Sequence, residues 1–311
     1  MLYKRASAAW SHVAGTAPPA RAAVLNGDCR QLLAAIPDES IALVVTSPPY
    51  SMGKEYESGN DVAEFIRAHE LVLPEIMRVV KPGGSICWQV GHHVERNAVT
   101  PLDYLVFDAM RKLKDAPVLR NRIIWTFGHG FHCERRFSGR HETILWFTKG
   151  AEYNFDLDAV RVAQKYPGKV SAKGPNKGMP SGNPLGKNPG DVWDIPNVKS
   201  NHVEKLDHPC QFPVALVRRL VGALTSSGDI VLDPYAGVAS SGVAALLEGR
   251  SFIGSELDQN YASAGAVRLR QTLDGVVRVR PDVPVSVPDP NSKVATRPDH
   301  FRDFCVDATL D

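Results

Sequence analysis

The chain has 311 residues and a formal net charge of +2, so it is not a polycation and any contact with nucleic acid must be local. Its cysteines are scattered without paired spacing, which favours a reducing, cytoplasmic setting. Residues 1–23 lack a continuous apolar core and no stretch is long and apolar enough to span a bilayer, so we expect neither a signal peptide nor a membrane anchor. This length can bury the core of one α/β domain with an inserted region.

A polar turn follows the first strongly apolar run. Ile41–Val45 contains only β-branched and aliphatic residues and predicts a buried parallel strand. Thr46-Ser47-Pro48-Pro49-Tyr50 comes next, and proline ends the strand because it lacks the amide donor. Ligands of open α/β sheets bind at the carboxyl ends of strands. We therefore expect this turn to hold a flat base by stacking, while its oxygen acceptors engage an exocyclic amine.

Helices and strands alternate over the next hundred residues. A helical pattern covers Val62–Val80, with an interruption at Pro74, and ends at a turn, Lys81–Gly84. The elements that follow are a strand at Ser85–Val90, a helix at Pro101–Leu113, a strand at Arg122–Phe127 and its antiparallel partner at Thr143–Phe147. This alternation predicts a mostly parallel, doubly covered sheet.

A basic, aromatic loop, Gly128–Glu142, joins the last two of these strands. We expect Arg135, Arg136 and Arg140 to face nucleic-acid phosphates, the alternative being a solvated loop. The loop also contains four residues of types that bind metals, but their spacing matches no standard zinc template, so we predict no metal site. These residues are His129, His132, Cys133 and His141.

Residues 151–205 differ in composition from the rest of the chain. Proline and glycine are dense, so this segment cannot bury a core of its own and is predicted to be a long loop or a segment that orders on binding. Its charge suits phosphate groups, whereas a plain flexible linker is the alternative. The lysines expected to contact nucleic acid are Lys165, Lys169, Lys173 and Lys177.

A second strand-end turn lies near the other end of the chain. Lys205–Pro213 leads into a predicted helix, Val214–Leu224, and Asp229–Leu232 predicts another buried strand. A turn of small residues, Asp233–Gly242, then opens a helix, and such units bring backbone amides and a helix N-terminus to an anionic group. Glu256 follows about twenty residues beyond Gly237, where an acidic side chain commonly binds ribose hydroxyls.

Together these segments resemble the motifs of the β-group DNA amino-methyltransferases, which use S-adenosylmethionine. Ser47-Pro48-Pro49-Tyr50 is similar to the catalytic motif, Asn26–Leu33 to motif III, and His208–Pro213 to motif X. The turn at 233–242 and Glu256 resemble motifs I and II. The order, with the catalytic motif first and the cofactor loop last, is that of the β group, and the resemblance covers residues 24–270.

The sequence departs from the family pattern at two places. The usual Phe-x-Gly-Ser-Gly-Thr is replaced by Tyr235–Ser240, in which Val238 and Ala239 take the places of a polar residue and a glycine. Phe212 replaces the usual lysine of motif X.

The resemblance implies a Rossmann-like methyltransferase fold, a doubly wound sheet with an inserted, loop-rich target-recognition region. It implies a catalytic half at 24–150, the recognition region at 151–205, a cofactor-binding half at 206–270 and a C-terminal tail at 271–311. Catalysis is assigned to Ser47, Pro48, Pro49 and Tyr50. Binding of S-adenosylmethionine is assigned to Asp28, His208, Asp233, Pro234, Tyr235, Gly237, Ser240 and Glu256. Asp28 has a second interpretation, because Gly-Asp before a helix is also an ordinary N-cap.

We therefore expect site-specific methylation of the exocyclic amine of a base flipped out of double-stranded DNA. Ser47 does not decide between N6 of adenine and N4 of cytosine, since both amines need the same acceptors. A homodimer, a cognate restriction enzyme and a solitary regulatory role stay open.

Three other functions also stay open. Val238 and Ala239 are compatible with a catalytically silent methyltransferase-like DNA-binding protein. The motif order argues against an RNA or protein methyltransferase. A nicotinamide dehydrogenase leaves Ser-Pro-Pro-Tyr unexplained.

Overall fold

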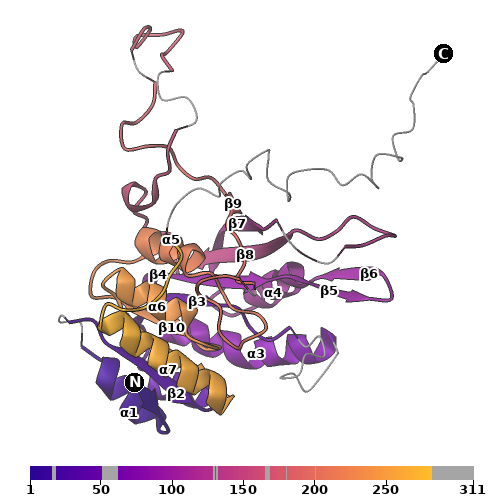
Figure 1. The fold of residues 1–311 in the computed structure, drawn as a ribbon, viewed down its shortest axis with the longest axis vertical. Helices are drawn as coiled ribbons and strands as arrows, with labels where there is room; N and C mark the ends of the chain where they lie inside the picture. The colour runs from indigo at the N-terminus through magenta and orange to yellow at the C-terminus, as the bar shows by residue number, and fades with distance from the viewer. Residues whose placement is uncertain are drawn as a thin grey trace. The chain divides into compact units, whose positions relative to one another are not determined.

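A nine-stranded sheet organises the chain between Met1 and Arg280 (Figure 1). In spatial order its strands are β1 (Leu2–Tyr3), β2 (Ala22–Asn26), β11 (Ser251–Glu256), β10 (Ile230–Asp233), β3 (Ile41–Thr46), β4 (Val80–Val90), β8 (His141–Thr148), β7 (Val118–Thr126) and β9 (Val192–Asp194). Neighbouring strands are parallel except where β8 pairs with β4 and β7. The computed structural model describes residues 1–15, 19–50, 62–128, 130, 132–164, 169–179, 181–199 and 201–281.

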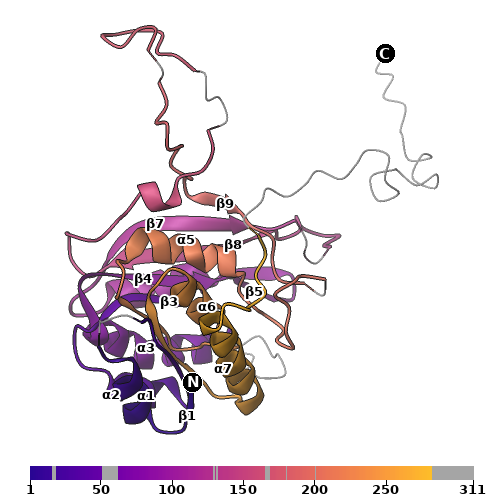
Figure 2. The same cartoon turned by 60° about the vertical axis from the view of Figure 1, so that its left-hand side comes forward.

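Helices cover both faces of this sheet, which confirms the predicted fold class. One face packs against α1 (Ala6–Val13), α2 (Cys29–Ala35), α3 (Val62–Val79) and α4 (Leu102–Arg111). The other packs against α5 (Val214–Leu224), α6 (Ser240–Leu247) and α7 (Gln259–Leu273), which lie side by side in Figure 2. Because apolar side chains point to both faces, the central strands are buried throughout, as in β3 and β10. In the described ranges, no helix has the length and apolarity to cross a membrane.

The predicted elements are present, with two differences around α3. The helix continues through Pro74, whose missing amide costs one backbone hydrogen bond on an otherwise strongly amphipathic helix. The predicted turn at Lys81–Gly84 was wrong, because these residues form the start of β4. A register shift between Ile41 and Leu43 in the β3–β4 pairing accommodates them. Tertiary pairing with β3 therefore overrides the local turn preference of Pro-Gly-Gly.

Two further features were not predicted. A short hairpin joins β5 (His92–Glu95) to β6 (Ala98–Pro101) before α4. The proline- and glycine-rich segment contributes a 3-10 helix, η1 (Asp158–Val160), and the edge strand β9, which pairs with β7. Between these two elements the described chain projects away from the sheet (Figure 1). Lys165 and residues 282–311 of the expected tail lie outside the described residues.

Candidate active site

Two adjacent strands bring the predicted catalytic turn and the predicted cofactor loop together. β3 and β10 pair in parallel, with Leu43 opposite Val231, so their carboxyl ends meet at one edge of the sheet. Thr46 at the end of β3 donates a hydrogen bond of 2.6 Å from Oγ1 to Oδ1 of Asp233 at the end of β10. Segments separated by almost the whole chain are thereby joined directly.

Asp233 organises the turn that follows β10. Its carboxylate accepts hydrogen bonds from the hydroxyls of Thr46 and Ser241 and from the backbone N–H of Tyr235. Burial raises the pKa of Asp233 to about 6, although the donors on Ser241, Thr46 and Tyr235 each oppose that rise. These contacts are made within the protein, so Asp233 contributes by shaping the loop.

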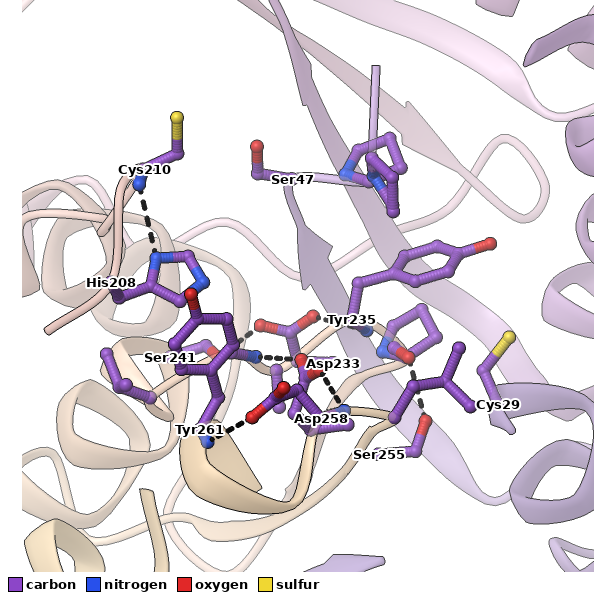
Figure 3. A pocket seen from close by; sticks show the side chains of 18 of the residues that line it. Cys29, Ser47, His208, Cys210, Asp233, Tyr235, Ser241, Ser255, Asp258 and Tyr261 are labelled. Carbon is purple, nitrogen blue, oxygen red and sulfur yellow. Dashed lines mark hydrogen bonds between the residues drawn. The ribbon is translucent and has the colours of Figure 1, made fainter. Parts of the chain in front are cut away.

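A cavity of about 630 Å³ opens at this edge of the sheet. A cavity of this size suits a cofactor or drug-sized ligand. In Figure 3, His208 and Tyr261 lie on one side of it and Tyr235 and Cys29 on the other. Every residue predicted to bind the cofactor or the reacting base lines it: Asp28, Ser47, Pro48, Pro49, Tyr50, His208, Asp233, Pro234, Tyr235, Gly237, Ser240 and Glu256.

A chain of hydrogen bonds fixes the aromatic ring of the catalytic turn. Tyr50 donates its hydroxyl proton to Oε1 of Gln89 at 3.0 Å, and Gln89 donates from Nε2 to Glu142. Ser47 Oγ lies 3.3 Å from the Tyr50 hydroxyl, whose proton is already donated, so Ser47 is the donor of that contact. Burial, and secondly the charge of Glu142, raises the pKa of Tyr50, which keeps the phenol neutral.

The acidic residues at the other end of the cavity are held by backbone donors. Glu256 accepts from the N–H of Gly237 on Oε2 and from that of Asp258 on Oε1, each at 2.9 Å. Its pKa is raised, chiefly by burial. Asp28 accepts from the backbone N–H of Arg30 and caps α2, so it has the N-cap role as well as its place in the cavity. The hydrogen bond from the Arg30 side chain lowers the pKa of Asp28.

Gly237 lies in the tightest part of the cofactor loop. It adopts φ +50°, and a Cβ at this position would lie 2.9 Å from Nε2 of His208. His208 in turn packs its ring against Tyr261 of α7, with 4.6 Å between the ring centroids. Only glycine meets both the backbone and the space requirement here.

Sequence reasoning missed three residues of the site. Gln89 was a signal that could have been used, since it is a polar residue at the end of an apolar predicted strand and is 2% exposed. Glu142 starts β8 and reaches Gln89 only through the antiparallel pairing of β4 with β8. Tyr261 lines the cavity from α7, and no local pattern marks it.

The predicted nucleic-acid contacts lie elsewhere. Arg135, Arg136 and Arg140 lie on the connection between β7 and β8, where Arg135 is exposed and the other two are half-buried. Lys169, Lys173 and Lys177 are exposed on the projecting segment. None of these residues is among the described ones that line the cavity. Nor do the described parts of the chain gather three metal-binding side chains.

The open α/β sheet and the cavity at its strand ends define the class, a Rossmann-like methyltransferase. A family model described as DNA methylase matches residues 41–267, and the chain belongs to this N6/N4 DNA methylase family. The protein is an S-adenosylmethionine-dependent DNA amino-methyltransferase, acting at adenine N6 or cytosine N4.

Relatives and solved structures agree with this assignment. Type II methyltransferase M.BglII of Bacillus subtilis is 46% identical over 239 residues, which are 76% of this chain and 66% of that protein. Type II methyltransferase M.ScaI of Streptomyces caespitosus is 34% identical over 252 residues, or 78% of this chain and 80% of the relative.

Among structures, PvuII DNA methyltransferase (cytosine-N4-specific) has a TM-score of 0.64 at 22% identity, covering 83% of this chain and 92% of the other. TTHA0409, a DNA modification methylase from Thermus thermophilus complexed with S-adenosyl-L-methionine, has a TM-score of 0.56 at 26% identity. The match covers 83% of this chain and 96% of TTHA0409.

Proposed function

We propose that Ser47, Pro48, Pro49 and Tyr50 bind a base flipped out of duplex DNA, and that residues 233–240 with Glu256 bind the methyl donor beside it. One observation carries this proposal. The two sets of residues line the same cavity and are joined by the hydrogen bond between Thr46 and Asp233. A base on the Ser-Pro-Pro-Tyr turn and a cofactor on the loop after β10 therefore meet.

The residues present fit S-adenosylmethionine. The N-terminus of α6 opens into the cavity at Ser240, where backbone amides and the helix dipole suit the methionine carboxylate. Glu256 uses one acceptor site of each oxygen for a backbone N–H, which leaves acceptor capacity for two ribose hydroxyls. Leu257 also lines the cavity and is 73% exposed, so it offers apolar surface for an adenine ring.

The catalytic turn orients the amine that is methylated. When bound, S-adenosylmethionine supplies a methyl group on a positively charged sulfur, which leaves as a thioether. Ser47 gives its own proton to Tyr50, so its lone pairs and the Pro48 carbonyl accept the hydrogens of the exocyclic amine. These acceptors favour a more tetrahedral nitrogen, whose lone pair attacks the methyl group in line. The nitrogen then loses a proton to water, because a neutral serine is a poor base, and positioning lowers most of the barrier.

Duplex DNA is the proposed substrate form, since the amine of a paired base is hidden until the base is flipped. The basic loop (Arg135, Arg136, Arg140) and the lysines at 165–177 are proposed to contact its phosphates. We propose the division into a catalytic half (24–150), a recognition region (151–205), a cofactor half (206–270) and a tail (271–311) on the same grounds. A DNA substrate also implies a cytoplasmic location, a homodimer follows from the family resemblance, and the relatives named type II suggest a cognate restriction enzyme.

The experiment that tests the function is methylation of duplex DNA with labelled S-adenosylmethionine, followed by digestion to nucleosides and mass spectrometry. N6-methyladenine or N4-methylcytosine identifies the target base in one step. Single-stranded DNA and RNA of the same sequence serve as substrate controls, and Ser47→Ala as the protein control. Label in RNA alone, or equal label with Ser47→Ala, contradicts the proposal.

A further inference from the structure

The cofactor loop contains a strained residue. Ala239 adopts φ 57° and ψ 40° directly before α6, a left-handed conformation that a residue with a Cβ disfavours. The family pattern has glycine at this position. Ala239 is completely buried, and its methyl group fits against α7 because Gly265 has no side chain: a Cβ there would lie 3.2 Å from that of Ala239. The packing accommodates the methyl group but does not by itself hold the backbone.

The guanidinium of Arg268, one turn further along α7, contacts the loop on both sides of Ala239. Nη1 donates to Oγ of Ser240 at 2.7 Å and to the carbonyl oxygen of Val238 at 3.4 Å. Arg268 is 4% exposed, so these hydrogen bonds are shielded from water and strengthened. Together they oppose any rotation at Ala239 that would separate Val238 from Ser240.

Glu204 supplies the counter-charge. Its Oε2 lies 3.6 Å from Nη2 of Arg268, and the two side chains are 1% and 5% exposed. The same carboxylate accepts hydrogen bonds of 3.0 Å from the backbone N–H groups of Val214 and Arg280, so both of its oxygens have partners. Burial lowers the pKa of Arg268 to about 10 while Glu204 opposes the shift, and the guanidinium therefore stays charged at neutral pH.

We propose that Arg268, with Glu204 as its counter-charge, is a positioning residue for S-adenosylmethionine. It holds Ala239 in the conformation that glycine adopts without help, so that Gly237 and the first amides of α6 face the cofactor. Arg268 is not among the described residues lining the cavity, so it acts through Val238 and Ser240. The inference rests on the proposed role of residues 233–240 as the cofactor loop.

The test is a double-mutant cycle of Arg268→Met and Ala239→Gly, with the Kd for S-adenosylmethionine measured by calorimetry. We expect Arg268→Met to raise Kd about tenfold, the loss of a charged hydrogen bond, and Ala239→Gly alone to change it less than about twofold. The double variant regains most of the lost affinity, since glycine needs no support. An unchanged Kd in Arg268→Met, or a double variant that binds as weakly as Arg268→Met, overturns the proposal.

Three controls separate positioning from stability. Arg268→Met/Glu204→Gln removes both buried charges, so we expect Tm to recover while Kd stays raised, and recovery of both overturns the proposal. Arg270→Met removes an exposed charge from the same helix and leaves Kd unchanged. Gly237→Ala adds a methyl group 2.9 Å from His208 Nε2. If that variant binds S-adenosylmethionine normally, the assignment of the cofactor loop is wrong rather than the role of Arg268.

Discussion

Thr46 and Asp233, which end two neighbouring strands, share a hydrogen bond of 2.6 Å at the boundary between the two halves of the cavity. We expect Thr46→Val to raise the Kd for S-adenosylmethionine and lower kcat together, each about fivefold, because one buried hydrogen bond to a carboxylate is removed. Thr46→Ser keeps the donor and should behave as wild type. A Thr46→Val enzyme with both constants unchanged would show that the two halves are positioned independently.

Tyr50 has separable roles in its ring and its hydroxyl. Tyr50→Phe keeps the stacking surface but loses the hydrogen bond to Gln89, so we expect kcat to fall about fivefold. Tyr50→Ala removes the ring and should cost about a hundredfold, as should Ser47→Ala, which removes an acceptor of the amine. Single-turnover rates measure these losses. The Kd for S-adenosylmethionine should be nearly unchanged in all three variants, and a large rise there would place these residues in the cofactor half.

Glu256 should affect the cofactor and not the base. Glu256→Ala removes the proposed ribose acceptor together with the partner of the Gly237 N–H, so we expect Kd for S-adenosylmethionine to rise about 10- to 100-fold. Kd for duplex DNA, measured without cofactor, stays within about twofold of wild type. Normal affinity for S-adenosylmethionine in this variant would rule out the assignment of Glu256.

His69 should give stability a specific pH dependence. It accepts from Trp88 Nε1 on Nε2, contacts the Phe65 carbonyl through Nδ1, and its burial lowers its pKa from 6.5 to about 4. The unfolded chain therefore takes up a proton near pH 6.5 while the folded protein stays neutral. This contribution to stability is intact above pH 6.5 and falls by about 1.4 kcal/mol per pH unit down to about pH 4.

The measurement is the free energy of unfolding of wild type and His69→Gln between pH 4 and pH 8. Glutamine can replace both hydrogen bonds but does not titrate. Asp233 acts in the opposite sense over part of this range, because its raised pKa makes the folded protein bind a proton first. Only the difference between the two proteins isolates His69. A difference that does not change with pH would contradict the prediction.

The basic loop should determine salt dependence. Replacing Arg135, Arg136 and Arg140 singly with alanine is expected to reduce the slope of log K for duplex DNA against log salt by about one unit for each phosphate that the variant no longer neutralises. Kd for S-adenosylmethionine should not change in these variants. Unaltered slopes in all three would favour a solvated loop.

Most of the fold and the composition of the cavity could be predicted from the sequence because the signals are local. Ile41–Thr46 and Ile230–Asp233 are uniformly buried, and each is followed by a turn with its own chemistry. Partners that reach the site across the sheet or from a distant helix left no such signal: Glu142 needs the β4–β8 pairing, and Arg268 needs α7 docked on the loop. The Lys81–Gly84 turn was wrong for the same reason, since pairing decided it.

The strand order also bears on how the protein is made. β10 and β11 lie between β2 and β3 in the sheet, yet the ribosome synthesises them after every other strand. Until they emerge, β2 and β3 each expose an unpaired apolar edge that invites association with other chains. A message truncated before Ile230 yields an aggregation-prone fragment without the loop that follows β10. Methyl transfer therefore begins in one step, late in translation, and an unfinished chain cannot mark DNA.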